Sequence, residues 1–283
     1  MTQPGFQTTP PPCSTAKLSF PNPHTLLVTL SRPQSLNCIN SQGHHDLHNI
    51  FTWLDNEPSL RIGIITGEGR AFCAGADLKE ANQINTSNTP RGEPSPSGFG
   101  GLSRRRGKKP VIAAVNGLAL GGGCEIVANC DIVLAAPSAV FAFPEVKRGL
   151  VAIAGALPRI ARVVGRMRAM EMALTGRTVG ADEARSWGLC NAISERDGDG
   201  LGVEGGVVKM AVKWAEVICG NSPDSVVTSK AGIELAWDGI GAEEGSQRLV
   251  EGMWKKMEGK ENMKEGVRAF VEKRRPRWVD SKL

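Results

Sequence analysis

Two glutamates are the side chains of this sequence whose surroundings best suit proton transfer. Glu125 follows three consecutive glycines, Gly121–Gly123, and Glu145 lies twenty residues later in the stretch FAFPEVKRG. Glycines leave backbone N–H groups uncovered, and the apolar run after them is typical of a helix, whose first N–H groups have no partner within it. An uncovered N–H beside a carboxyl group in apolar surroundings can stabilise an oxyanion while a proton moves. The pattern therefore indicates acid–base chemistry.

Two short apolar runs predict the elements that position these residues. Val111–Val115 has the β-branched and small apolar residues of a strand buried on both faces, and it precedes the glycines. A second run, Ile62–Thr66, precedes the stretch RAFCAGADLKE at Arg70–Glu80, where a glycine-containing turn again comes before a predicted helix. The sequence thus predicts two strand–turn–helix units, each presenting backbone N–H groups at its turn.

The AGAD turn, the segment NGLALGGGCE and the segment FAFPE, in this order and near these spacings, resemble the crotonase (enoyl-CoA hydratase/isomerase) superfamily. The resemblance extends from about Lys17 to the C-terminus. It implies an α/β fold (an α+β spiral) with a crotonase-like core of repeated β-β-α turns. It also implies a helical C-terminal region that builds homotrimers, often stacked as hexamers. The alternation of strand and helix patterns with short turns is consistent with this fold class.

The resemblance implies roles for particular residues. The backbone N–H groups of Ala76 and Gly122 would hold the thioester carbonyl of an acyl-CoA substrate as an enolate forms. Such a donor is worth about 3–4 kcal/mol of transition-state stabilisation in comparable sites. The alternative interpretation is that both stretches are ordinary turns at which helices begin. The residues implied to bind the substrate are Ala74, Gly75, Ala76, Asp77, Leu78, Lys79, Gly121, Gly122, Trp254 and Lys273.

Five of these residues would contact the coenzyme A part of the substrate. Asp77–Lys79 would line the groove on the nucleotide side, Trp254 would flank the adenine, and Lys273 would reach a phosphate. A lysine at a helix end and a tryptophan on an apolar face are also commonly a solvated charge and a core residue. The implied chemistry uses no metal and no cofactor, because coenzyme A is part of the substrate.

The presence of two acids favours hydration over isomerisation. Hydratases of the family carry glutamates at both matching positions, whereas its Δ3,Δ2-isomerases commonly keep one acid. Ala76, Gly122, Glu125 and Glu145 are therefore the predicted catalytic residues of an enoyl-CoA hydratase, which adds water across the 2,3 double bond. The alternative is a Δ3,Δ2-enoyl-CoA isomerase using Glu145 alone. A further alternative is a non-catalytic relative that binds coenzyme A or RNA.

One stretch departs from the family pattern. Where many hydratases read GxxPGxGG after the second acid, this chain has Ala152 in place of the proline and Ile153 in place of a glycine. That glycine helps to start a helix close to the attacking water, so Ile153 predicts a narrower pocket.

The composition limits the other possibilities. The 283 residues are 41% hydrophobic and 22% charged, which is ordinary for a globular chain, and no apolar run reaches the length of about 20 residues that spans a bilayer. The start lacks the features of a secretory signal, and seven scattered cysteines indicate reduced thiols. A net charge of +5 suits an anionic ligand such as a CoA thioester and by itself says little about nucleic acid. Nucleic acid is nevertheless not an expected partner, because the resemblance implies an acyl-CoA substrate. No GxSxG, GxxxxGK[ST] or GxGxxG motif supports a hydrolase, an NTPase or a dehydrogenase.

The predicted organisation has three parts: a disordered arm at 1–16, a core at 17–206 with a mobile loop at about 82–109, and a helical region at 207–283. Besides the runs above, the predicted strands are Thr25–Leu30, Asp131–Ala135 and Val140–Phe143. The predicted helices are Ser41–Leu54, Ala152–Val164, Arg166–Leu174, Ala181–Trp187, Val207–Cys219, Pro223–Trp237, Glu243–Met257 and Lys260–Lys273.

Three further stretches each allow a functional interpretation. The basic run Arg104–Lys109 is interpreted as a solvated loop in preference to a phosphate or nucleic-acid site, and His44 with His48 as a polar helix face in preference to metal ligands. The tripeptide Ser281, Lys282, Leu283 matches a peroxisomal address that an import receptor reads. The sequence therefore predicts a peroxisomal location.

Overall fold

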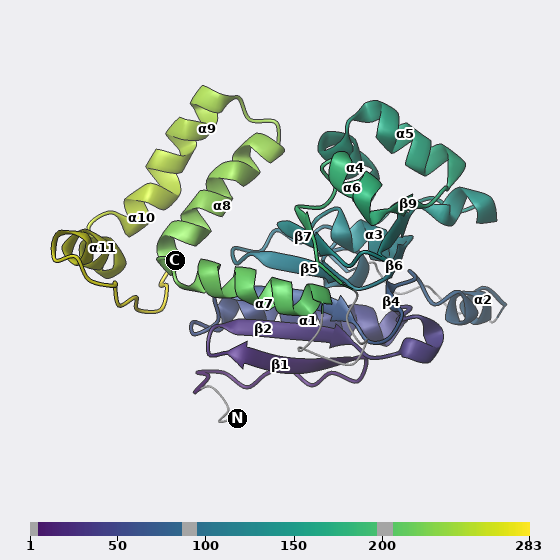
Figure 1. The fold of residues 1–283 in the computed structure, drawn as a ribbon, viewed down its shortest axis with the longest axis horizontal. Helices are drawn as coiled ribbons and strands as arrows, with labels where there is room; N and C mark the ends of the chain where they lie inside the picture. The colour runs from purple at the N-terminus through teal and green to yellow at the C-terminus, as the bar shows by residue number, and fades with distance from the viewer. Residues whose placement is uncertain (1–4, 87–94, 197–205) are drawn as a thin grey trace.

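The computed structural model describes residues 5–86, 95–196 and 206–283, and its core contains two β-sheets (Figure 1). The larger sheet has the order β1-β2-β3-β5-β7-β10, and the smaller has the order β4-β6-β8-β9. Pairing is parallel except between β1 and β2 and between β8 and β9. The strands are β1 Ala16–Asn22, β2 Thr25–Leu30, β3 Ile62–Gly67, β4 Ala71–Cys73, β5 Val111–Val115, β6 Leu118–Leu120, β7 Ile132–Ala135, β8 Val140–Ala142, β9 Val179–Gly180 and β10 Ala192–Ile193.

From β3 to β8, successive strands alternate between the two sheets, which gives the core its spiral form. β3 and β4, β5 and β6, and β7 and β8 each pass from the larger sheet to the smaller one. Asn116 fixes one of these crossings, because its Oδ1 accepts from Gly67 N at 3.0 Å and its Nδ2 donates to Gly69 O at 2.8 Å. Asn37 stabilises the crossing from β3 to β4 by donating to Glu68 O and Ala71 O. This mixed α/β spiral confirms the predicted fold class.

Helices cover both faces of the larger sheet (Figure 1). α1 buries Leu47, Ile50 and Leu54 against one face, and α7 buries Val207 and Ala211 against the other. The helices of the core are α1 Ser41–Asn56, α2 Leu78–Thr86, α3 Gly122–Val127, α4 Ala156–Val164, α5 Arg166–Thr175, α6 Ala181–Ser186 and α7 Gly206–Cys219, with 3-10 turns η1 Pro33–Ser35, η2 Phe99–Gly101 and η3 Pro144–Arg148. In the described residues, no helix is long and apolar enough to cross a membrane.

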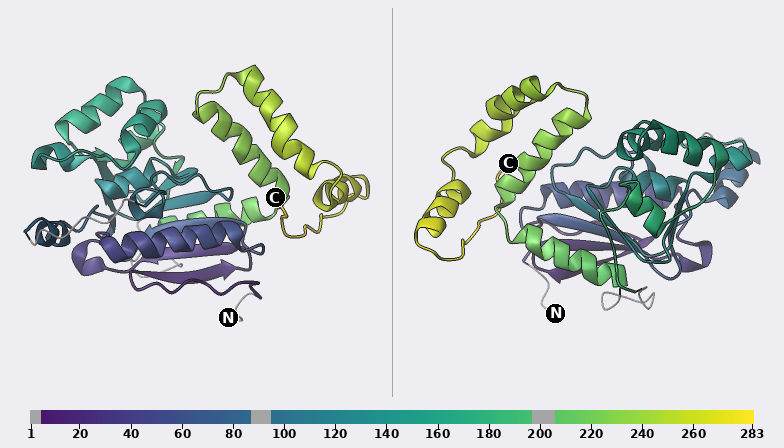
Figure 2. Two further views of the ribbon diagram at one scale, coloured as in Figure 1. Left: turned by 180° about the vertical axis from the view of Figure 1, so that it is seen from behind. Right: turned by 45° about the horizontal axis from the view of Figure 1, so that its top comes forward.

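The C-terminal region projects from the core as a helical arm, seen from both sides in Figures 1 and 2. It comprises α8 Pro223–Trp237, α9 Ala242–Leu249, a π-helical turn η4 Val250–Trp254, α10 Lys255–Met257 and α11 Glu261–Val271. Leu249 packs against Gly232, so α8 and α9 form a hairpin. Phe270 is 86% exposed and Ile233 is 72% exposed. The arm therefore presents apolar side chains that the single chain does not cover.

The structure differs from the predicted disordered arm over residues 5–15, which lie on the core. Phe6 packs against Phe20 and Trp53, with ring centroids 4.7 and 5.3 Å away. The carboxylate of Glu57 accepts hydrogen bonds from Gln7 N, Thr8 N and Thr8 Oγ1. A composition rich in proline and threonine did not reveal that a buried carboxylate 50 residues away would order the segment.

The predicted mobile loop at 82–109 is also only partly irregular. α2 extends to Thr86, and residues 95–109 include η2, where Phe99 and Leu102 are buried beneath α1. Within the basic run, the side chain of Arg105 is 7% exposed, with its Nη2 bonded to Asp55 Oδ1 at 2.6 Å, and the buried Lys109 ammonium donates to Glu57 O. The interpretation of a solvated loop is therefore wrong for Arg105 and Lys109. The remainder of the predicted loop, 87–94, lies outside the described residues.

Two helices begin elsewhere than predicted. Asn40, not Ser41, caps α1, because its Oδ1 accepts from Gly43 N at 2.9 Å. α4 begins at Ala156 and not at Ala152, after Gly155 adopts a φ of +125°. Helical spacing of apolar residues cannot separate the last turn of a loop from the first turn of a helix.

Candidate active site

The AGAD turn leaves one backbone N–H free. Ala74 N donates to Leu36 O at 3.0 Å, Gly75 N to Cys73 Sγ at 3.4 Å, and Asp77 N to Ile39 O at 3.0 Å. Within the described residues, the N–H of Ala76 has no such partner, and Ala76 is exposed. A single β-bridge pairs the turn with Ile39, and this bridge does not use the N–H of Ala76. The N–H of Ala76 is therefore available to a ligand.

The triple-glycine turn lies directly against the AGAD turn. Gly75 has a φ of +98°, and a Cβ built on it would lie 3.3 Å from Gly122 N and 3.0 Å from Leu120 O. A Cβ on Gly123 would overlap the carbonyl oxygen of Cys73. Gly122 is the first residue of α3, so its N–H has no partner within the helix, and Gly121 at the N-cap supplies no side chain. Glycine is required here because two backbones meet.

Phe99, a residue that sequence reasoning did not select, forms part of this site. A Cβ on Gly122 would come within 2.5 Å of the Phe99 ring, so the ring lies on the peptide that carries the second N–H. The edge of His44 packs on Phe99 at 4.6 Å, and His44 Nδ1 accepts from Gly100 N at 3.0 Å. His44 is thus a packed, hydrogen-bonded residue. The described residues contain no group of three or more potential metal ligands.

Glu125 lies in the first turn of α3 and is 4% exposed. Its Oε1 accepts from Ala156 N at 3.4 Å, which places the carboxyl group at the N-terminus of α4. Burial raises the pKa of Glu125 to about 7, backbone N–H groups of residues 154–156 oppose that shift, and the charge of Glu145 adds to it. Near neutral pH this carboxyl group therefore exists in both protonation states.

Glu145 lies in the first turn of η3, and its carboxyl group is close to the triple-glycine turn. Its Oε1 would be 3.1 Å from a Cβ on Gly121, and its Oε2 is buried with no hydrogen-bond partner among the described residues. Burial raises the pKa of Glu145, while its own backbone N–H and Arg148 act in the opposite direction. An acid with one unpartnered oxygen beside a glycine turn is free to exchange a proton with a ligand there.

Of the residues predicted to bind coenzyme A, the structure brings only Asp77–Lys79 to this site. Asp77 caps α2 by accepting from Lys79 N, and it forms an ion pair with Arg32 at 2.9 Å. Trp254 and Lys273 lie on the C-terminal arm, at the opposite end of the molecule from α2 (Figure 1). Arg32 was missed because its only sequence signal, an arginine before a proline, is common in loops.

The predicted narrowing of the pocket by Ile153 is wrong. The Ile153 side chain is 83% exposed, whereas Ala152 is buried. The helix that meets Glu125 starts three residues after Ile153, at Ala156. The isoleucine therefore does not crowd the carboxyl group.

Comparison with known proteins places this geometry in a family. The sequence profile of the enoyl-CoA hydratase/isomerase family matches residues 22–281. A mevalonyl-coenzyme A hydratase of Beauveria bassiana is 52% identical over 98% of this chain and 99% of its own length. A second, of Aspergillus fumigatus, is 48% identical over 94% of this chain and 95% of its own length.

The solved structures agree. An enoyl-CoA hydratase of Mycobacterium marinum matches with a TM-score of 0.83 and 32% identity, covering 94% of this chain and 99% of its own. A probable enoyl-CoA hydratase/isomerase of Mycobacterium abscessus gives 0.82 and 35%, covering 94% and 98%. With the family's three motifs in one site, the chain is a hydro-lyase that belongs to the enoyl-CoA hydratase/isomerase family, within the crotonase superfamily.

Proposed function

We propose that the enzyme interconverts a 2-enoyl-CoA and its 3-hydroxyacyl-CoA at the site formed by Ala76, Gly122, Glu125 and Glu145. The observation that carries this is that both acids lie at the triple-glycine turn, which meets the AGAD turn: Glu125 is in the first turn of α3, and Glu145 Oε1 is 3.1 Å from a Cβ on Gly121. The thioester oxygen would accept hydrogen bonds from Ala76 N–H and Gly122 N–H. Negative charge that develops on this oxygen as the enolate forms is then stabilised by fixed donors.

The two carboxyl groups supply the proton transfers. In hydration, ionised Glu125 takes a proton from water, the oxygen bonds to C3, and protonated Glu145 gives its proton to C2. Dehydration reverses each step: Glu145 takes the C2 proton, and Glu125 protonates the departing hydroxyl group. Each direction needs one proton on the pair, which suits two coupled acids of raised pKa. This chemistry uses no metal and no cofactor beyond the coenzyme A of the substrate.

The isomerase alternative has less support. Moving a double bond needs one acid that takes and returns a proton, and Glu145 could do this alone. The buried carboxyl group of Glu125 would then have no task, yet it is kept at a helix N-terminus where burial raises its pKa to about 7. Keeping such a group costs stability, so its retention favours hydration.

The acyl group is proposed to be mevalonyl or a close analogue. The two relatives near 50% identity are both named mevalonyl-coenzyme A hydratases, whereas a probable enoyl-CoA hydratase of Dictyostelium discoideum is 36% identical. A mevalonyl group has a tertiary C3 hydroxyl and a C5 hydroxyl. The enzyme would remove water from C2 and C3 and retain the C5 oxygen.

The coenzyme A part is proposed to lie between subunits of a homotrimer or hexamer. Asp77–Lys79 adjoin the AGAD turn of the same chain, whereas Trp254 and Lys273 lie on the distant arm. Trp254 is 37% exposed, and Lys273 follows α11. An arm from a neighbouring subunit could place both residues near the nucleotide. The proposed location is the peroxisome, through the address Ser281–Leu283 and an import receptor.

A panel of thioesters tests the proposed reaction and substrate. Mevalonyl-CoA, 3-hydroxybutyryl-CoA, crotonyl-CoA and a 3-enoyl-CoA are offered to the pure protein, and loss or gain of the conjugated thioester is followed by absorbance. We expect the highest kcat/KM with mevalonyl-CoA. Higher activity on crotonyl-CoA would overturn the mevalonyl assignment alone, and turnover of only the 3-enoyl-CoA would overturn the hydratase assignment.

A further inference from the structure

Two histidines of α1 hold a segment of the chain, residues 97–101, that reaches the proposed catalytic site. His44 Nδ1 accepts from Gly100 N at 3.0 Å, and His48 Nδ1 lies 3.0 Å from Ser97 Oγ. The two histidines are one helical turn apart, so both contacts come from the same face of α1. The polar helix face predicted from the sequence is therefore bound to this segment.

Phe99, in the middle of the segment, fills the space beside Gly122. A Cβ on Gly122 would lie 2.5 Å from the Phe99 ring, which is 9% exposed. Gly75 of the AGAD turn approaches the same residue at its nitrogen, because a Cβ on Gly75 would lie 3.3 Å from Gly122 N. If the ring moved away, the start of α3 could shift into the vacated space, and the Gly122 N–H would shift with it.

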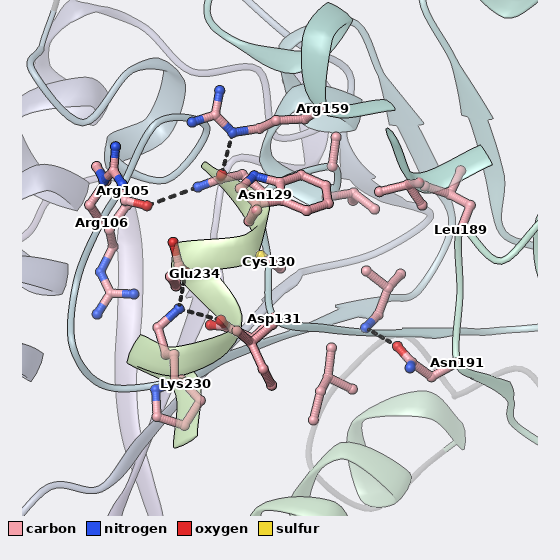
Figure 3. A pocket seen from close by; sticks show the side chains of 18 of the residues that line it. Arg105, Arg106, Asn129, Cys130, Asp131, Arg159, Leu189, Asn191, Lys230 and Glu234 are labelled. Atoms are coloured by element: carbon pink, nitrogen blue, oxygen red, sulfur yellow. Dashed lines mark hydrogen bonds and ion pairs between the residues drawn. The ribbon is translucent and has the colours of Figure 1, made fainter. Parts of the chain in front are cut away.

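The backbone of the segment is also held from its C-terminal side. Ser103 Oγ accepts from Phe99 N at 2.7 Å and donates to Ala154 O at 2.7 Å. Asn129, which follows α3, donates to Arg105 O at 3.1 Å, as drawn in Figure 3. These bonds fix where the segment lies, and they make no contact with the aromatic ring itself.

His44 is the side chain that contacts both the ring and the backbone next to it. The His44 ring meets Phe99 edge-on, with centroids 4.6 Å apart, and the buried Gly100 donates its N–H to the same imidazole. Burial lowers the pKa of His44, although the charge of Glu80 acts in the opposite direction, and the neutral ring is the form that can accept at Nδ1. A buried N–H that loses its acceptor costs about 1–3 kcal/mol, which is enough to displace a short segment.

We propose that His44 is a positioning residue for the hydration reaction: it holds the Phe99 ring against Gly122 and so keeps the Gly122 N–H directed at the thioester oxygen. The inference rests on the proposed function, because it gives His44 a part in that reaction. His44 acts through Phe99 and needs no contact with the substrate. Complete loss of one such donor costs about 10²–10³ in kcat, and a displaced donor loses part of this.

Two substitutions of His44 test the proposal by steady-state kinetics. His44→Phe keeps an aromatic edge at Phe99 but leaves the Gly100 N–H without an acceptor, whereas His44→Asn puts an oxygen where Nδ1 accepts. We expect His44→Phe to lower kcat by about 10–100-fold with little change in KM, and His44→Asn to recover it to within about threefold of the wild type. His45→Gln, a change of the exposed neighbouring histidine, is the matched control and should alter neither constant.

Binding of acetoacetyl-CoA provides a measurement that does not depend on hydration. This thioester can ionise to an enolate when bound, and the near-ultraviolet absorbance of the enolate reports how well the two N–H groups stabilise negative charge. The enolate fraction should fall in His44→Phe and return in His44→Asn, while thermal melting shows that each variant is folded. If His44→Phe does not fold, Phe99→Leu, which withdraws the ring from Gly122, should give the same fall.

The outcomes separate this inference from the proposed function. Wild-type kcat and enolate fraction in folded His44→Phe, no recovery in His44→Asn, or an unchanged enolate fraction in folded Phe99→Leu would each overturn the positioning role. A wild-type protein that stabilises the enolate but hydrates no thioester would overturn the proposed function, and the enolate fractions of the variants would then decide the role of His44.

Discussion

At the scale of single residues, Glu125 and Glu145 differ in what holds their carboxyl groups. The N-terminus of α4 binds one oxygen of Glu125, whereas Oε2 of Glu145 is buried and has no hydrogen-bond partner in the part of the chain that the structure describes. Both acids have a raised pKa, and the charge of Glu145 contributes to the shift of Glu125. Near neutral pH the carboxyl group of Glu125 can therefore gain or lose a proton, and burial favours the protonated form of Glu145 as well.

Removing either acid should stop hydration. Glu125→Gln and Glu145→Gln keep the size of the side chain but cannot exchange a proton, so each should lower kcat by about 10²–10⁴ with little change in KM. The two losses should not add, because the acids act as a unit. Steady-state kinetics measures this, with exposed Glu244→Gln as the matched control. Near-wild-type turnover by both variants would exclude the proposed mechanism.

Glu125 should make the protein less stable as pH rises. The pKa of Glu125 in the folded protein, about 7, lies above the ordinary 4.5, so the folded state binds more protons than the unfolded state between these values. Stability is thus lost as pH rises from about 4.5 to 7. At pH 8, Glu125→Gln should therefore have a free energy of unfolding higher than that of the wild type, by at most about 3 kcal/mol, and a higher melting temperature. Near pH 4.5 the two proteins should melt at the same temperature. If the variant and the wild type melted at the same temperature at both pH values, this would contradict a raised pKa of Glu125.

The predicted catalytic residues lie within short sequence motifs. Ala76, Gly122 and both glutamates sit in motifs whose chemistry is visible in a few consecutive letters, and the structure brings all four together. Sequence reasoning did not identify Phe99, which reaches Gly122 from a segment of serine, proline and glycine. Contacts made across the fold leave no local pattern in the sequence.

At the scale of elements, length separates what could be predicted from what could not. The strands at Thr25–Leu30 and Val111–Val115 have five or more apolar or β-branched residues and were predicted with their observed bounds. The strands Ala71–Cys73 and Leu118–Leu120 have three residues each and were not predicted, because alternation cannot be read over so few positions. The smaller sheet is built from strands of two or three residues, and of these only Val140–Ala142 was predicted.

The N-terminal segment gives a prediction at this scale. Glu57 is fully buried, and its hydrogen bonds to Thr8 and Ser59 help to lower its pKa to about 2. A lowered pKa stabilises the fold above about pH 4.5, and that contribution is lost as pH falls toward 2. Glu57→Gln replaces an acceptor oxygen with a donor and should cost about 1–3 kcal/mol.

Limited proteolysis measures the expected release of residues 5–15. Cleavage in this segment should be faster in Glu57→Gln than in wild type, and Phe6→Ala should act in the same direction through the aromatic cluster. Gln247→Glu, an exposed change on α9, serves as the control. Unchanged cleavage in Glu57→Gln would show that the segment does not depend on this carboxylate.

At the scale of the whole molecule, we propose that the arm packs against neighbouring subunits. Val267, Phe270 and Val271 are 62%, 86% and 73% exposed, and burial of such side chains is a usual reason for assembly. Light scattering at micromolar concentration should give a trimer or a hexamer. Phe270→Glu should shift the mass toward the monomer and raise the KM for the CoA substrate. A wild-type monomer would contradict this prediction.

The address tripeptide should control location without affecting catalysis. Ser281 Oγ donates to Asp224 Oδ1 at 2.6 Å, on the arm side of the molecule and away from Glu125. Deletion of Ser281–Leu283 should therefore leave specific activity unchanged and move a fluorescent fusion from peroxisomes to the cytosol. Peroxisomes that still contain the deleted protein would refute the address.

The order of the strands has a consequence for synthesis on the ribosome. Both sheets add their strands in chain order, so each turn of the spiral can pair as it emerges. One face of the larger sheet nevertheless stays bare until α7 is made, because Leu27, Ile64 and Ile112 are covered by residues after 206. A nascent chain therefore carries an open apolar face for most of its translation, and holding that face is a task for chaperones.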